Sequence, residues 1–143
     1  MDKISGYKHK INITVRFSDL DAMGHVNNAT FLSYLEESRI AYFSDVLKRN
    51  FNNLGFGGIV ARIEIDYKYQ IGLGNKVTVY ARCKGIGEKS MDIENIIVVR
   101  KADKNIIAAY ALLKLVTYDY KKKVTIPVPD DVRKTLMEYD KIL

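Results

Sequence analysis

The sequence predicts a single α+β domain, residues 1–143, in which one long helix packs against a mostly antiparallel sheet. Its length suits one domain, and its 48% apolar content argues against disorder. Residues 28–47 have the spacing of an amphipathic helix, and no second long helix follows. The remaining segments alternate apolar and polar residues, which is typical of strands with one buried face.

The expected elements follow in order along the chain. The first strand is expected at residues 10–17, and Asn27 can cap the helix of residues 28–47 because its side-chain oxygen can accept an orphan backbone N–H. On that helix, four apolar residues fall near one face: Leu32, Leu35, Phe43 and Val46. Asparagines and glycines between residues 50 and 58 indicate a loop.

Four further strands are expected, at residues 62–71, 77–83, 91–100 and 106–116, the last of them nearly all apolar and therefore the most buried. A short terminal helix, capped by Asp130, should end near Lys141. One helix can cover only one face of five strands. A second copy of the chain is therefore expected to cover the other face or an edge of the sheet.

Composition narrows the function classes. The net charge of +6 suits an anionic ligand such as a coenzyme, although nucleic acid or an ordinary lysine-rich surface would fit as well. Cys83 is the only cysteine, which leaves no intrachain disulfide. No apolar stretch is long enough for a membrane span and no signal peptide is recognisable, so a cytoplasmic location is expected. His9 and His25 are not spaced as metal ligands, and no metal site is expected.

The loop before the helix holds the candidate chemistry. A carboxylate beside a helix N-terminus can act as base or nucleophile in acyl transfer, while free backbone N–H groups hold a developing oxyanion. Asp21 suits that role, and a turn-forming aspartate is the alternative. Asp19 lies on the same side if the strand pattern continues, or it pairs with Arg16. His25 can act as an acid or hold a turn.

Residues 16–39 match the pattern D-x-D-x-x-G-H-V-N-N-A-x-(Y/F)-L-x-(Y/F)-L-E-E-x-R almost completely. With this motif the chain resembles the hotdog-fold acyl-CoA thioesterases of the 4-hydroxybenzoyl-CoA thioesterase group. A weaker likeness continues to about residue 118. Gln70 stands where proline is frequent in the family, and Asn75 where aspartate is frequent. Glu36 and Glu37 belong to the motif but are expected on a solvated or interface face of the helix.

The resemblance implies a hotdog fold, in which an antiparallel sheet of five or six strands wraps around the helix. It implies that Asp21 is the catalytic aspartate and that the Asn28 amide polarises the thioester carbonyl. Substrate contacts are expected from His25 and Asn27, and from Lys89 and Ser90, although these last two could form a plain surface turn.

The implied reaction converts an acyl-CoA to a free acid and coenzyme A, with no cofactor and with neither nucleic acid nor membrane as partner. The resemblance also implies a homodimer or homotetramer with each site at a subunit interface. Alternatives are a thioesterase for acyl carrier protein and a non-catalytic acyl-CoA-binding hotdog module. Whether Asp21 acts as a base or as a nucleophile stays open.

Overall fold

The computed structural model describes residues 3–142. The order of elements is strand, long helix, four long strands, a short strand and a terminal helix, with 3₁₀ turns at Phe17–Asp19 and Phe51–Asn53. Their bounds are β1 His9–Thr14, α1 Asn28–Leu47, β2 Gly57–Tyr67, β3 Lys76–Ile86, β4 Ser90–Lys101, β5 Lys104–Asp119, β6 Val124–Thr125 and α2 Asp130–Asp140. The α+β class predicted from the sequence is confirmed.

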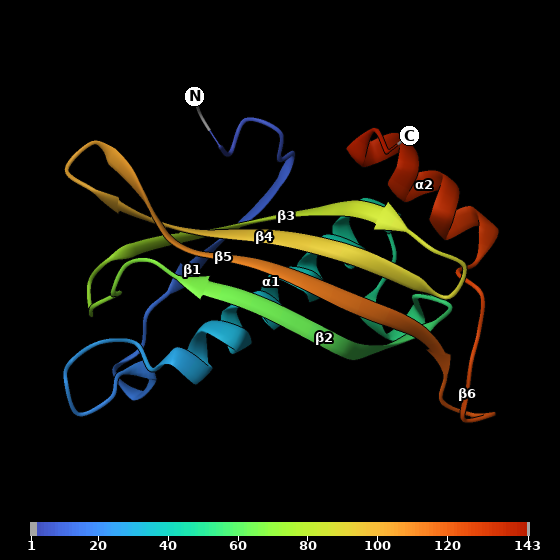
Figure 1. The fold of residues 1–143 in the computed structure, drawn as a ribbon, viewed down its shortest axis with the longest axis horizontal. Coiled ribbons are helices and arrows are strands. Elements are labelled where there is room, and N and C mark those ends of the chain that lie inside the picture. The colour runs from blue at the N-terminus through green and yellow to red at the C-terminus, as the bar shows by residue number, and fades with distance from the viewer. Residues whose placement is uncertain (1–2, 143) are drawn as a thin grey trace.

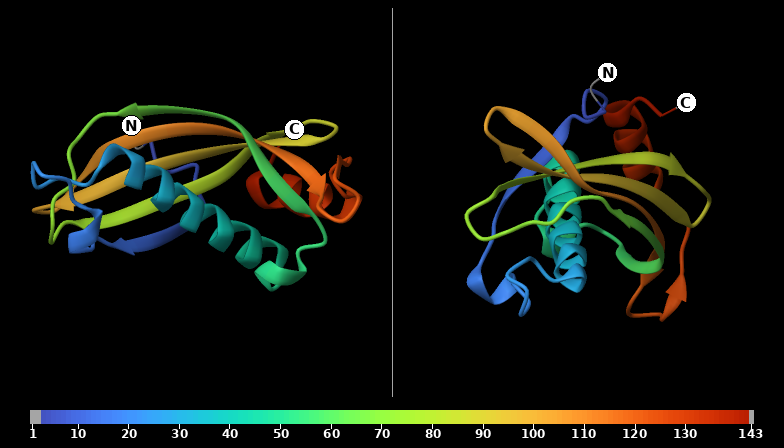
Figure 2. Two further views of the ribbon diagram at one scale, coloured as in Figure 1. Left: turned by 90° about the horizontal axis from the view of Figure 1, so that it is seen from below. Right: turned by 60° about the vertical axis from the view of Figure 1, so that its left-hand side comes forward.

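The strands form one antiparallel sheet in the order β1-β3-β4-β5-β2, with β6 paired to the end of β5. Neighbours in the middle of the sheet are in register, for example Val79 with Ile97 and Ile97 with Ala109. The sheet curls around α1, which lies along its concave face (Figures 1 and 2). This is the expected hotdog arrangement. The most buried strand is the central β4, not β5 as predicted, because β4 has a neighbour at full length on both sides.

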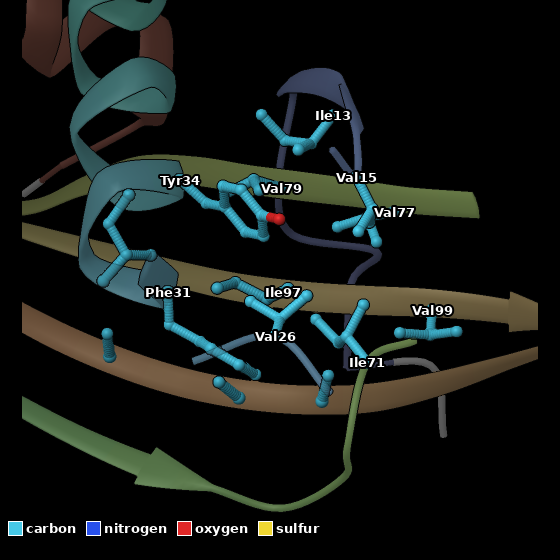
Figure 3. Close-up of a cluster of buried hydrophobic side chains, with 14 residues drawn as sticks. Ile13, Val15, Val26, Phe31, Tyr34, Ile71, Val77, Val79, Ile97 and Val99 are labelled. Atoms are coloured by element: carbon cyan, nitrogen blue, oxygen red, sulfur yellow. The ribbon is translucent and has the colours of Figure 1, made fainter. Parts of the chain in front are cut away.

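Helix α1 supplies one side of the core. Phe31 and Tyr34 from its first turns pack against Val79 and Ile97 of the sheet (Figure 3). The expected cap is present, since Asn27 Oδ1 accepts the N–H of Ala29 at 2.8 Å. Leu32 was expected to be buried but is 37% exposed. The buried stripe includes Phe31, and the next residue along a helix is rotated by roughly 100°.

The far half of the core lies under α2. Val132 and Leu136 of this helix join a buried cluster with Tyr42 and Phe43 of α1. Asp130 is the first residue of α2, while Pro129 occupies the cap position predicted for Asp130.

The convex face of the sheet is partly covered by the chain's own N-terminal segment. Tyr7 packs on Ile96 and Val98, and its hydroxyl donates to the buried Glu94 carboxylate at 2.7 Å. A second copy is therefore not required over all of this face. The edge strand β2 remains open, and Val60 on it is 39% exposed.

Candidate active site

A tight loop between β1 and α1 presents Asp21 at the surface. The Asp21 N–H donates to His25 O at 2.8 Å, and the Gly24 N–H donates back to Asp21 O at 3.0 Å. Gly24 has φ of 82°, a conformation that residues with a Cβ rarely adopt. The backbone of residues 21–25 therefore closes on itself and holds the aspartate at a fixed place.

The Asp21 carboxylate keeps one oxygen available. Its Oδ1 accepts the N–H of Met23 at 2.9 Å, which is a turn-forming contact. Within residues 3–142, Oδ2 accepts no hydrogen bond, and the side chain is exposed. The structure thus shows the turn-forming interpretation, and the catalytic one stays a prediction for which Oδ2 is free to meet a water molecule or a ligand.

Asp19 has a different environment. It is only 4% exposed, and its carboxylate accepts three hydrogen bonds, from the Arg16 N–H at 3.0 Å, the Arg16 guanidinium at 3.1 Å and the Tyr34 hydroxyl at 2.8 Å. Burial alone would raise the pKa of this carboxyl, but the three hydrogen bonds outweigh it and hold the pKa below its ordinary value.

The strand pattern does not continue to Asp21, because residues 17–19 form a 3₁₀ turn. Asp19 consequently faces inward and Asp21 faces solvent. The pairing of Asp19 with Arg16, one of the two interpretations from the sequence, is the one the structure shows.

The start of α1 lies directly after this loop. Asn28 is the first helical residue, and within residues 3–142 its N–H has no protein acceptor. The Asn28 carbonyl accepts the Tyr67 hydroxyl of β2 at 2.8 Å, and the Asn27 N–H donates to Asp19 O at 2.9 Å. Two fixed contacts thus position a free N–H at the positive end of a 20-residue helix.

His25 and Asn27 lie in the same loop but make different contacts. His25 is half-buried and bridges Gly72 through its backbone. The side-chain oxygen of Asn27 is already used as the helix cap. Tyr67 was not singled out from the sequence as a site residue, and only its weak likeness to the family in residues 63–67 pointed to it.

Lys89 and Ser90 lie far from this loop in the same chain. Lys89 lies in the turn between β3 and β4, and Ser90 begins β4, at the opposite end of the sheet from the β1–α1 loop (Figure 1). The 11 residues of β3 span roughly 35 Å between these two ends. A single chain does not bring Lys89 and Ser90 to Asp21, so their expected role in one site would need a second chain.

A hollow of about 1030 Å³ opens beside the C-terminal half of α1. The helix, the loop of residues 51–56, the start of β2 and the end of β5 form its walls. Glu36 and Arg39 of α1 border it, with Arg39 Nη2 at 3.9 Å from Glu36 Oε2. Glu36 and Glu37 are exposed, as expected.

Among residues 3–142, no three His, Cys, Asp or Glu side chains gather in a way that could hold a metal ion. None of the helices in this part of the chain is long and apolar enough to cross a membrane.

Similar proteins of known sequence include two bacterial ones. The Escherichia coli long-chain acyl-CoA thioesterase FadM is 27% identical over 127 residues, which are 87% of this chain and 93% of FadM. The uncharacterised Bacillus subtilis protein YsmA is 32% identical over 81 residues. That match covers 57% of this chain and 54% of YsmA, so the chain spans about half the length of that relative.

Solved structures agree with the fold. A Thermus thermophilus thioesterase complexed with coenzyme A and zinc superposes with a TM-score of 0.85 at 34% identity, covering 97% of this chain and 98% of that one. A 4-hydroxybenzoyl-CoA thioesterase superposes with a TM-score of 0.80 over 90% of this chain and 97% of its own, and at 15% identity it shows the fold alone. The family model for the thioesterase-like superfamily matches residues 15–136. The chain therefore belongs to the thioesterase-like superfamily, as residues 16–39 predicted.

Proposed function

We propose that this protein hydrolyses acyl-CoA thioesters at Asp21 and the N-terminus of α1. One observation carries the proposal: an exposed carboxylate with a free oxygen lies in a fixed loop that leads directly into the unpartnered Asn28 N–H. Similar proteins support it, since FadM is named a long-chain acyl-CoA thioesterase and the Thermus relative is a thioesterase complexed with coenzyme A.

In the proposed reaction, the thioester carbonyl oxygen accepts the Asn28 N–H. The helix dipole and this donor stabilise the negative charge that develops on that oxygen. Asp21 either takes a proton from the attacking water or attacks the carbonyl carbon itself, forming a mixed anhydride that water then opens. In both routes the C–S bond breaks, the thiolate of coenzyme A leaves and takes up a proton, and the acid is released.

The proposed assembly is a homodimer formed through β2. This strand ends the sheet, and within residues 3–142 its outer backbone groups have no strand partner. Exposed apolar side chains extend from this strand to the outer face of α1, namely Leu32, Ile40, Ile59, Val60 and Tyr67. An open edge next to apolar side chains favours a second copy of the same chain.

A two-fold axis through the middle of β2 would place its Tyr67 end beside the Gly57 end of the partner's β2. Tyr67 anchors the start of α1, whereas Ile59 lies in one cross-strand row with Val116 and Ser90. Ser90 is two strands from that edge, roughly 10 Å away. The dimer would therefore bring Lys89 and Ser90 of one chain toward the active site of the other.

The test is a thiol-release assay with short, long and aromatic acyl-CoAs. Asp21→Asn keeps the shape of the side chain but removes both the base and the nucleophile, so kcat should fall at least about a hundredfold. Asp103→Asn, an exposed carboxylate in the β4–β5 turn, is the matched control and should keep its activity. Full activity of Asp21→Asn would contradict the proposed mechanism. If the wild type bound the esters but released no thiol from any of them, the chain would be a non-catalytic module.

A further inference from the structure

The hollow beside α1 combines apolar walls with charged residues, of which Arg39 is recessed, while Glu36, Asp119 and Lys121 also border it. Phe43, Leu54, Phe56 and Leu115 contribute aromatic and aliphatic surface to it. Such a lining suits a chain of methylene groups. Arg39 lies among these residues, on the face of α1 that borders the hollow.

Arg39 lacks the partners that a buried guanidinium needs. Its side chain is only 12% exposed, yet within residues 3–142 it makes no hydrogen bond. Its nearest carboxylate, Glu36, is 68% exposed and lies 3.9 Å away. Burial lowers the pKa of Arg39, because this distant and hydrated carboxylate does not replace the water that the guanidinium has lost.

Other arginines show what satisfied pairing looks like in this chain. Arg49 donates to Leu54 O at 2.7 Å and forms an ion pair with Asp131. Arg100 resembles Arg39 in having only a carboxylate at 3.9 Å, but it is 55% exposed and can be hydrated. Arg39 is therefore both poorly paired and poorly hydrated, which points to an anionic group that enters the hollow.

We propose that the hollow receives the acyl group of the substrate and that Arg39 selects acyl groups with a carboxylate at their far end. The substrate class would be the half-thioesters that coenzyme A forms with α,ω-dicarboxylic acids. A carboxylate and a guanidinium form two parallel charge-assisted hydrogen bonds, which are stronger where the guanidinium is largely withdrawn from water, as Arg39 is. This inference rests on the proposed hydrolysis of acyl-CoA.

The position of the hollow agrees with such a substrate. It borders Gly57, Gly58 and Val60, the end of β2 that the proposed two-fold axis turns toward the partner's active site. A thioester held at the partner's Asn28 would then extend its acyl group into this hollow, with its far carboxylate at Arg39. Arg39 is recessed toward the hollow, so a ligand inside it can reach the guanidinium more readily than a group on an outer surface.

The experiment compares two substrates of equal chain length, dodecanedioyl-CoA and dodecanoyl-CoA, with the full chain. The wild type should have a higher kcat/KM for the diacid ester, by roughly tenfold or more, as expected for hydrogen bonds to a charged partner. Arg39→Gln should lose this preference, whereas Arg100→Gln, the matched change at an exposed arginine, should retain it. Arg39→Lys keeps the charge but lacks the planar pair of N–H donors, and it should therefore retain only part of the preference.

Three outcomes would overturn the inference. The wild type could show no preference for the diacid ester, or Arg39→Gln could keep the wild-type ratio. Arg39→Gln could also lower both activities equally while sedimentation shows a loss of the dimer, in which case Arg39 pairs with a second copy of the chain. Failure of the proposed function looks different, because wild type would then release no thiol from either ester. Calorimetric titration of both esters would still test whether Arg39 sets a binding preference.

Discussion

The hydroxyl of Tyr34 donates a hydrogen bond to Asp19 Oδ2 at 2.8 Å and so ties α1 to the loop that carries Asp21. The backbone of Asp19 makes a second tie, because its carbonyl accepts the Asn27 N–H just before the helix begins. The two aspartates of the motif therefore have different roles. Asp19 is buried and fixes the relative position of loop and helix, while Asp21 is exposed and meets the substrate in the proposed reaction.

Asp19→Asn should destabilise the fold by about 2–3 kcal/mol, because an amide cannot accept all the hydrogen bonds that the buried carboxylate receives. Urea unfolding at neutral pH measures this loss. Asp21→Asn is the control, since that side chain is exposed and, among residues 3–142, its one hydrogen bond is from the Met23 N–H. Equal losses of stability in the two variants would contradict the division of roles.

The contribution of Asp19 to stability should depend on pH. Its pKa is lower in the folded state than the ordinary value of 3.8, so the folded protein binds this proton less readily than the unfolded chain. The extra stability is present above the unfolded value and is lost as the pH falls through the folded pKa. The difference in unfolding free energy between wild type and Asp19→Asn should be constant from about pH 5 to 8 and shrink below about pH 4. A difference that stays constant down to about pH 2 would count against this assignment.

Much of the fold could be predicted because, in most of its helices and strands, the apolar residues recur with one clear period. The alternation in β3 predicted the buried row Val77, Val79, Ala81 and Cys83, and all four are buried. The start of β2 was missed because Gly57 and Gly58 resemble a loop. A Cβ on Gly57 would lie 2.3 Å from the Tyr120 ring, so these glycines serve close packing within a strand.

The site was predicted less completely, for two physical reasons. The sequence could not show that residues 17–19 turn, which separates Asp19 from Asp21. A local sequence pattern also does not show which residues from opposite ends of a sheet come close together. Lys89 would approach Asp21 only if the Asp21 belonged to a second chain. Arg39 ends the motif of residues 16–39 but was given no role, because its lack of partners becomes visible only when the helix and the hollow are assembled.

A lysine on the open edge should weaken the dimer. Val60→Lys places a charge among the exposed apolar residues of β2, and natural proteins use lysine in this way to block edge pairing. Sedimentation at micromolar concentration should show the 16.3 kDa monomer increasing at the expense of the dimer. Leu73→Lys, at a residue 56% exposed outside α1 and β2, is the matched control and should leave the assembly unchanged. A wild type that sediments only as the monomer would contradict the proposed assembly.

Asn28→Pro tests the helix N-terminus, because proline removes the one backbone N–H assigned to the thioester oxygen. The first position of a helix tolerates proline well, since that N–H has no intrahelical partner. Asn27 has φ of −59° and ψ of 139°, an extended conformation that a following proline permits. The Asn28 carbonyl that accepts the Tyr67 hydroxyl is retained. We expect kcat to fall about 100- to 1000-fold with little change in stability, as for the loss of one oxyanion donor.

Asn28→Ala keeps the N–H and should retain most of the activity. If the proline and alanine variants were equally active, the Asn28 amide would have no part in the reaction.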